Sequence, residues 1–416
     1  MNNNQKQYNM ATITIKNVGP IKSVENLELN KVNVFMGPQC SGKSTIAKII
    51  SFCTWMEKKL AREGEVNTNH DEFWYFEKLQ TYHRLTNDFF SDDSYIYYDG
   101  QNISYLYERL KSKFQYIESR AKIEHKQENK FFNSKIIYIP AERNFVSVVP
   151  NLEKYLEKRD SIHDFIISWF EAKRTYGDKN KLPILNFGIQ YHTDSFDNDF
   201  ITHDTGVKLK LQSASSGLQS VVPLLVLLDY VAIGLYGKSR PMSVQERDTL
   251  IGKYNEMVQR KKEADESIDS VDLEVLLDLI VSKNYTNSQF IVEEPEQNLF
   301  PSTQRDLVYH LLRLITGERD HRLTITTHSP YILYALNNCM MAGLVYDKMD
   351  EEDKDAIVCK YSLINPKDVS IYQIEDGILK NIQQEDGLIG KNYFDEKMKE
   401  LMDDFYILLK YYDDEK

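Results

Sequence analysis

A glycine-rich loop between two apolar segments constrains this chain more than any other feature of its sequence. Residues 32–36 form an apolar run typical of a buried strand, and apolar residues at helical spacing follow the loop. The loop consists of Gly37, Pro38, Gln39, Cys40, Ser41, Gly42, Lys43, Ser44 and Thr45. Backbone N–H groups at a helix N-terminus bind phosphate charge, and glycine lets the backbone come close. The sequence therefore predicts a phosphate-binding loop between a strand and a helix.

The last residues of this loop have specific roles. By itself the motif indicates bound ATP or GTP together with Mg²⁺. We expect Lys43 to reach the β- and γ-phosphates, Ser44 to coordinate Mg²⁺ and Thr45 to bond the α-phosphate. A chance match in a glycine-containing turn is the alternative, and the strand before the loop and the helix after it argue against that alternative.

A second motif supplies carboxylates at the end of another apolar run. Phe-Ile-Val at 290–292 predicts a buried strand, and Glu-Glu-Pro-Glu at 293–296 follows it. We expect Glu293 to bind Mg²⁺, although aspartate is more usual there, and Glu294 to be the general base that polarises the attacking water. An acidic loop at a strand end is common on its own, and the glycine-rich loop upstream gives this one its meaning.

Two polar segments say little when each is taken alone. The Ser/Gly cluster at 213–220 precedes an apolar run and would ordinarily be a helix N-cap. Thr-Thr-His-Ser-Pro at 326–330 ends another apolar run, and a lone histidine such as His328 is usually structural. Their order relative to the other two motifs suggests more.

The order P-loop, Ser/Gly cluster, Glu-Glu strand and His328 resembles ABC-type ATPases of the SMC, Rad50 and OLD superfamily. The finer resemblance is to stand-alone OLD-like ATPase subunits of bacterial anti-phage systems of the Septu or PARIS type. It is carried by residues 138–143, 215–219, 293–301 and 327–330, and it spans roughly residues 11–340. The fold class that it implies is α/β: an ABC-type P-loop ATPase head, with mixed sheets, flanking helices and helical insertions.

The resemblance also implies a composite site. It implies a head-to-tail dimer that sandwiches two ATP molecules, and a higher homo-oligomer built of dimers is the alternative. The signature segment of one subunit would then contact ATP held by the other through Ser215, Ser216, Gly217 and Gln219. Asn298 would lie in the loop that couples the two sites, and His328 would be the switch histidine that senses the γ-phosphate. The catalytic set would be Glu294, His328 and Lys43. Gln101 and the segment 142–143 are both candidates for the Q-loop.

Domain organisation follows from the same reading. We expect an ATPase head at 11–345, with helical insertions at about 51–134 and 238–283, and a C-terminal α+β extension at 346–416. Leu106, Leu110, Phe114 and Ile117 predict one helical stripe in the first insertion. Residues 145–183 are expected to be helical, and residues 184–212 alternate like antiparallel strands.

Composition limits the partners and the compartment. With 51 Lys and Arg against 63 Asp and Glu, the net charge is −12, so no chain-wide attraction to nucleic acid is available. Residues 108–130 hold seven Lys/Arg against four Glu, a bias more typical of an ordinary solvated helix, although nucleic-acid binding stays possible. The apolar run at 221–237 contains Pro223 and Asp229 and predicts a buried core helix, so no membrane contact is expected. Four scattered cysteines without a C-x-x-C pair and an N-terminus unlike a signal peptide favour the cytoplasm.

The sequence gives no sign of a nuclease. OLD nucleases carry a C-terminal TOPRIM domain with paired-metal acids, whereas the Asp-x-Asp at 197–199 lies in a predicted hairpin and is expected to be a turn. The leading hypothesis is an ATPase sensor or scaffold subunit that controls a separate, nuclease-like effector protein. The alternative is a DNA-binding repair or maintenance ATPase of the RecF or SMC type. A transporter subunit is disfavoured by the insertions and the long C-terminal region.

Overall fold

The computed structural model describes residues 10–63, 72–111, 117–126, 133–155, 160–236 and 285–412, together with the isolated residues Gly252 and Gln259. Within these ranges the larger of two sheets has eleven strands, in the order β6-β5-β4-β1-β2-β15-β14-β3-β13-β12-β7. Its strands are β1 (Thr12–Val18), β2 (Ile21–Glu28), β3 (Val32–Met36), β4 (Phe90–Asp99), β5 (Ile103–Lys111), β6 (Ile117–His125), β7 (Ser134–Ile139), β12 (Asn287–Glu293), β13 (Arg322–Thr327), β14 (Val369–Glu375) and β15 (Ile378–Asn381). The mixed α/β fold expected from the sequence is confirmed.

The large sheet has a parallel half and a mostly antiparallel half. Strands β14, β3, β13, β12 and β7 all pair in parallel, whereas β1 pairs antiparallel with β2 and β4, and β5 with β4 and β6. All five residues of β3 are buried, as a parallel strand covered on both faces requires. Because parallel strands point the same way, the segments that leave their carboxyl ends meet at one edge of the sheet.

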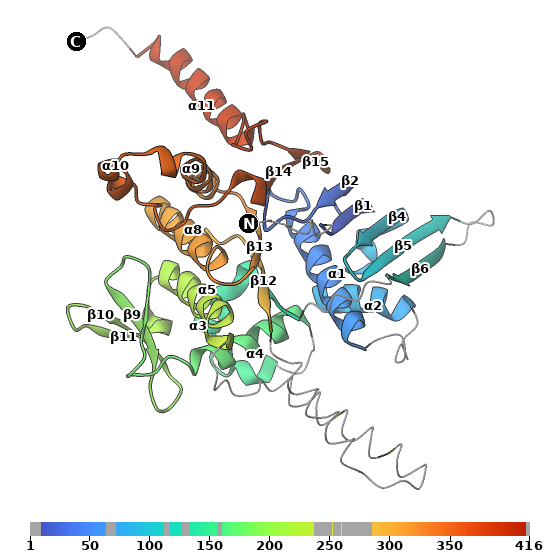
Figure 1. Cartoon of the computed structure of the whole chain (residues 1–416), viewed down its shortest axis with the longest axis horizontal. Coiled ribbons are helices and arrows are strands. Elements are labelled where there is room, and N and C mark those ends of the chain that lie inside the picture. The colour runs from blue at the N-terminus through green and yellow to red at the C-terminus, as the bar shows by residue number, and fades with distance from the viewer. Residues whose placement is uncertain are drawn as a thin grey trace, which may run out of the picture.

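Helices cover both faces of the parallel half (Figure 1). On β3, Val34 and Met36 belong to one apolar core and Phe35 to the other. The helices are α1 (Lys43–Glu63), α2 (Glu72–His83), α3 (Phe145–Val148), α4 (Ser161–Lys173), α5 (Ser216–Ala232), α8 (Pro301–Ile315), α9 (Pro330–Val345), α10 (Glu351–Ala356) and α11 (Tyr393–Leu409). Residues of α1 and α2 pack into the core that contains Phe35, and residues of α4, α5, α8 and α9 pack into the other.

The helix α5 is the apolar segment that the sequence places in the core. Among the described residues, Ser216–Tyr236 is the one helical stretch long and apolar enough to cross a membrane, judged by length and composition only, and most of it is buried inside the molecule. Its neighbours include α3, α4, α8 and β12. The expectation of a buried core helix is confirmed.

The expectation of a helical insertion at 51–134 is wrong for residues 90–111 and 117–125. The end of α1 and all of α2 are helical, but β4, β5 and β6 then form three antiparallel strands (Figure 1). Leu106 and Leu110 lie on β5, Ile117 begins β6, and Phe114 lies outside the described residues. The real pattern is alternation: Ile103, Tyr105 and Tyr107 are buried at every second position, and aromatic and β-branched residues favour strands.

Other expectations meet the structure in different ways. Residues 184–212 form antiparallel strands, as expected: β9 (Ile189–Thr193), β10 (Asp199–His203) and β11 (Lys208–Lys210) build the smaller sheet with β8 (Leu182–Pro183). The expected helical stretch at 145–183 contains α3 and α4. The expected boundary at 345 follows α9, yet two strands beyond it join the large sheet: β14 lies beside β3, and β15 lies between β14 and β2. Apart from Gly252 and Gln259, the expected insertion at 238–283 lies outside the described residues.

Candidate active site

The P-loop connects β3 to α1 at the carboxyl edge of the parallel strands. Gly37 and Gly42 adopt φ angles of 153° and 105°, and a Cβ atom at these positions would lie 2.6 Å from the Ile374 carbonyl oxygen and 2.8 Å from Ile21 Cγ1, respectively. Larger residues would therefore push β14 or β2 away from the loop. The backbone N–H of Ile46 donates to the Gly42 carbonyl at 3.0 Å, so the first helical turn of α1 grows directly out of the loop.

The ammonium of Lys43 lies inside the loop. Its Nζ donates to the carbonyl oxygens of Gly37 (3.0 Å) and Pro38 (2.7 Å), and the residue is 4% exposed. Burial lowers the pKa of Lys43 to about 8, while the nearby carboxylates, Glu294 first among them, act in the opposite direction. A negatively charged phosphate beside this ammonium would stabilise the charged form of Lys43, which burial disfavours.

Glu293 ends β12 and provides a buried carboxylate. It is 6% exposed, and its Oε1 has no hydrogen-bond partner among the described residues. Burial raises the pKa of Glu293, against which the nearby hydroxyls of Tyr138 and Ser44 and the charge of Lys48 act. An unpartnered carboxylate oxygen close to a hydroxyl fits a hard divalent cation, which takes oxygen ligands. Ser44 and Glu293, expected to bind Mg²⁺, therefore lie together.

Glu294 is held in an uncommon backbone conformation. Its φ angle is 42°, a left-handed value, and its backbone N–H donates to the Thr326 carbonyl at 2.9 Å. The carboxylate Oε1 lies 3.2 Å from His328 Nε2, and this hydrogen bond is the largest cause that lowers the pKa of Glu294. The side chains are 33% and 29% exposed, so both remain accessible from outside. The pair brings the expected base and the expected switch histidine into contact.

Glu296 is a structural residue of this edge that the sequence did not single out. Its Oε1 accepts from the backbone N–H of His328 (2.6 Å) and from Thr327 Oγ1 (2.9 Å). Burial raises its pKa, and its Oε2 has no hydrogen-bond partner among the described side chains. Glu296 thus fixes the end of β13, on which His328 depends for its position.

Arg143 is the second residue whose role the sequence left open. It is completely buried and donates to backbone carbonyls alone: those of Pro140, Ser220, Glu293, Glu294 and Pro295. Burial lowers its pKa to about 10, and the charge of Glu296 is the leading opposing effect. One guanidinium therefore connects the loop after β7, the helix α5 and the Glu-Glu loop after β12. The segment 142–143 was a Q-loop candidate, but the guanidinium of Arg143 bonds backbone carbonyls inside the protein.

The residues of the expected signature form a separate, exposed cluster. Ser215 caps α5 by accepting from the Leu218 N–H at 3.5 Å, and both Ser215 and Ser216 are exposed. A Cβ at Gly217 would lie 2.9 Å from the Asn298 carbonyl oxygen. Asn298, with φ at 61°, donates from Nδ2 to Ser220 Oγ at 2.9 Å.

Gln219 completes the cluster by donating from Nε2 to the Gln212 carbonyl at 2.9 Å. In the described part of the chain no hydrogen bond joins Ser215, Ser216, Gly217, Gln219 or Asn298 to the P-loop. Ser215, Ser216, Gly217, Gln219 and Asn298 therefore gather at the start of α5, and we call this group the signature surface. Lys43, Glu293, Glu294 and His328 gather at the carboxyl ends of the parallel strands, and we call this group the P-loop edge. Arg143 lies between the two.

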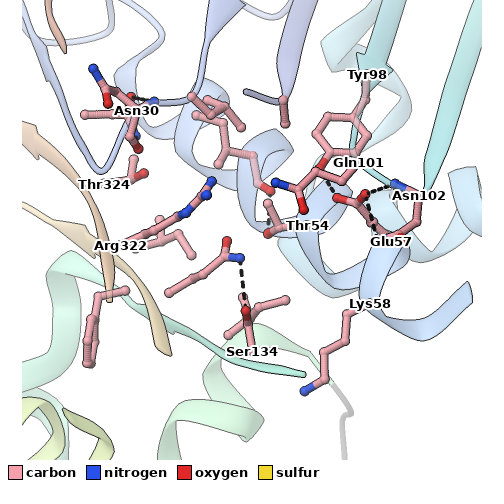
Figure 2. A pocket seen from close by; sticks show the side chains of 18 residues that line it. Asn30, Thr54, Glu57, Lys58, Tyr98, Gln101, Asn102, Ser134, Arg322 and Thr324 are labelled. Carbon is pink, nitrogen blue, oxygen red and sulfur yellow. Dashed lines mark hydrogen bonds between the residues drawn. The ribbon is translucent and has the colours of Figure 1, made fainter. Parts of the chain in front are cut away.

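Gln101 lies far from the P-loop. It lines a cavity of about 60 Å³ at the opposite edge of the sheet, with Arg322 from the amino-terminal end of β13 (Figure 2) and Gln289 from the amino-terminal part of β12. Its neighbour Glu57 is on α1, 14 residues beyond Lys43, which corresponds to roughly 21 Å along a helix. The candidate Q-loop role of Gln101 is therefore not retained.

The acidic pairs resemble no paired-metal site. The Asp-x-Asp at 197–199 begins in a tight turn, as expected, with Asp197 at a φ of 67°. A second Asp-x-Asp, at 353–355, which the sequence motifs above do not include, lies within the short helix α10. Among the described residues no group of three or more His, Cys, Asp and Glu side chains is arranged to hold a metal ion.

Comparisons with known proteins add only loose resemblances. No protein-family model and no curated protein matches the chain. Of solved structures, the SMC head domain from Thermotoga maritima has a TM-score of 0.37 at 11% identity, covering 90% of this chain and 99% of that one. The ATP-binding cassette MJ0796, a dimer bound to ADP and Pi, has 0.32 at 11% (89% and 99%). The recombination mediator RecF has 0.31 at 10% (90% and 98%). Scores this low carry no argument about function.

Proposed function

We propose that this protein is an ABC-type ATPase that binds and hydrolyses ATP. One observation carries the proposal: the P-loop, His328 and Glu294 follow the carboxyl ends of β3, β13 and β12, which are neighbouring parallel strands. Ligands of open α/β sheets bind at this edge, outside the carboxyl ends of the strands. A phosphate cradle, a carboxylate and a histidine there are the groups that phosphoryl transfer to water requires.

Each residue takes a role that its surroundings support. Lys43 would bind the β- and γ-phosphates, and the carbonyls of Gly37 and Pro38 hold its ammonium ready in the loop. Glu294 would accept a proton from the attacking water, and its hydrogen bond to His328 orients the carboxylate. Ser44 and Glu293 would hold Mg²⁺, which neutralises charge on the phosphate oxygens when it is bound.

We further propose that a second copy of the chain completes the ATP-binding site. Ser215, Ser216 and Asn298 are exposed, and within the described ranges the signature residues make no hydrogen bond to the P-loop of the same chain. In a head-to-tail dimer, Ser216 of one copy would face the ATP that Lys43 of the other copy binds. Two identical composite sites would result, as two-fold symmetry requires.

For the biological role we propose the sensor or scaffold subunit of an anti-phage defence system, controlling a separate nuclease-like effector from the cytoplasm. The motif resemblance at 138–143, 215–219, 293–301 and 327–330 supports this role. All four cysteines are free, which fits a reducing compartment. A repair or maintenance ATPase that binds DNA is the competing outcome.

The test is purification of Glu294→Gln from its native host with ATP. We expect an ATP-dependent dimer and a co-purifying effector protein, because the variant keeps the binding groups but lacks the base. Lys43→Ala, treated identically, should yield neither. DNA in place of a protein partner, bound more tightly at low salt, would favour the maintenance role. Glu294→Gln that stays monomeric with ATP would contradict the composite site.

A further inference from the structure

The C-terminal helix α11 is well formed, yet it leads away from the rest of the molecule (Figure 1). Its start is fixed by a capping box between Asn392 and Asp395, and the Tyr393 N–H donates to Gln373 Oε1 at 2.8 Å. Phe394 packs against the core from the first turn. None of the residues in α11 is buried. The helix is therefore anchored at one end and uncovered along the rest of its length.

The uncovered part of α11 carries a regular apolar stripe. Its members are Met398 (61% exposed), Leu401 (67%), Phe405 (54%), Leu408 (68%) and, just after the helix, Tyr412 (84%). Their spacing is three, four, three and four residues, which is the a and d spacing of a heptad repeat. Helices of globular domains normally turn such a stripe toward their own core. Here it faces outward, as the seam of a coiled coil does before its partner is added.

Charges beside the stripe indicate which partner fits. Lys397 and Asp404 both occupy the g position of the heptad, seven residues apart. In an antiparallel pair of identical helices the g positions face each other, so Lys397 would meet the partner's Asp404, and symmetry would make the contact twice. In a parallel pair the g positions face e positions, which are occupied by Met402 and Leu409 and offer no opposite charge.

We propose that α11 binds α11 of a second copy of this chain as an antiparallel two-stranded coiled coil, without nucleotide. The exposed a/d stripe supplies the seam, and the paired g positions set the orientation. The 17 residues of α11 span about 26 Å, enough for more than two heptads. In the free chain Lys397 pairs with the exposed Glu400 carboxylate at 2.8 Å and lies 5.5 Å from the centre of the Tyr393 ring, and an exposed ion pair of this kind contributes little.

This contact does not depend on the proposed ATP sandwich, because α11 shares no residue with the P-loop edge or the signature surface. A chain with two separate self-contacting surfaces can join ATP-linked dimers into a larger closed assembly. The α11 contact would hold copies together between rounds of ATP turnover, when the sandwich is open.

The experiment measures self-association of the full chain without nucleotide by sedimentation velocity over about 1–50 µM, a range that detects micromolar dimers. We expect the wild type to dimerise and Leu401→Asp to dimerise at least about 30-fold more weakly, since it places a charge in the centre of the seam. Tyr406→Asp is the matched control: Tyr406 is 55% exposed on the same helix but occupies a b position outside the stripe. It should behave like the wild type.

A charge exchange tests the orientation. Lys397→Asp should weaken the dimer, and adding Asp404→Lys in the same chain should restore it, because the two g positions then regain opposite charges. A nucleotide-free wild type that is monomeric throughout the range would overturn the proposal. So would equal behaviour of Leu401→Asp and Tyr406→Asp, or a different protein bound to α11. ATP-driven dimerisation of Glu294→Gln combined with Leu401→Asp, which weakens the α11 contact, is a separate readout, so failure of one contact leaves the other testable.

Discussion

The P-loop edge and the signature surface differ in how much of the molecule surrounds them. At the P-loop edge, Lys43 and Glu293 are buried. Burial lowers the pKa of Lys43 and raises the pKa of Glu293, which favours the neutral form of each. On the signature surface, Ser215 and Ser216 are exposed. Ser215 caps the N-terminus of α5, and Gly217 lies close to the Asn298 carbonyl oxygen. Buried charged groups have lost contact with water, and a bound nucleotide can supply new partners for them. Exposed backbone at a helix N-terminus is instead suited to an anionic ligand that another molecule holds.

The difference predicts that the P-loop edge determines chemistry while the signature surface determines assembly. The sharpest test is Glu294→Gln, which should reduce ATP turnover by about 10²- to 10⁴-fold, the usual contribution of a general base. Radiolabelled phosphate release measures turnover, and ATP binding should persist. The control Glu318→Gln, at an exposed loop carboxylate, should leave turnover unchanged.

Ser216→Glu tests the signature surface. It places a negative charge where the second copy's γ-phosphate should lie, and repulsion over a few ångströms should reduce turnover by about 10- to 100-fold. Binding of ATP to a single chain should not change, and α5 should remain stable because an acid near a helix N-terminus is favourable. Ser195→Glu, in an exposed hairpin turn, is the control. Lost ATP binding in Ser216→Glu would mean that the signature acts within its own chain.

Arg143→Lys tests the connection between the two regions. A lysine retains the charge but cannot reach five carbonyls, so we expect a loss of about 2–4 kcal/mol in the free energy of unfolding. Urea denaturation with and without ATP would measure it. Arg174→Lys, whose partner Asp197 lies 3.8 Å away at an exposed position, should cost less than about 0.5 kcal/mol. Similar losses for both variants would show that Arg143 is not a structural connection.

The pH dependence of ATP affinity should give the smallest effect. The pKa of Lys43 is about 8 in the nucleotide-free chain, and phosphate contact raises it. The bound form therefore holds more protons above pH 8, so affinity should fall as pH rises, by about tenfold at pH 9. Lys43→Arg should flatten this profile, because guanidinium stays charged. A flat wild-type profile from pH 7 to pH 9 would contradict the lowered pKa.

Sequence reasoning located those site residues that carry their chemistry in their own side chains and lie at strand ends. Lys43 and Glu294 were predicted because a buried run followed by polar residues is visible in one dimension. His328 was predicted from its place in the order of the motifs. Arg143 could not be found in this way, since its partners are backbone carbonyls of distant segments that any residue type can supply. Residues 90–125 were assigned to helices because Leu106 and Leu110 are four residues apart, while the alternating tyrosines that pack β4 and β5 were given too little weight.

The central claim is that the two regions complete one site only across two copies of the chain. Mixing Lys43→Ala with Ser216→Glu tests it directly, because a mixed dimer contains one site with an intact P-loop and an intact signature. Each variant alone should retain at most about a tenth of wild-type turnover, and an equimolar mixture should recover up to about a quarter, since half of the dimers are mixed and each has one good site. A mixture as inactive as its components, with mixed dimers shown to form, would contradict the claim.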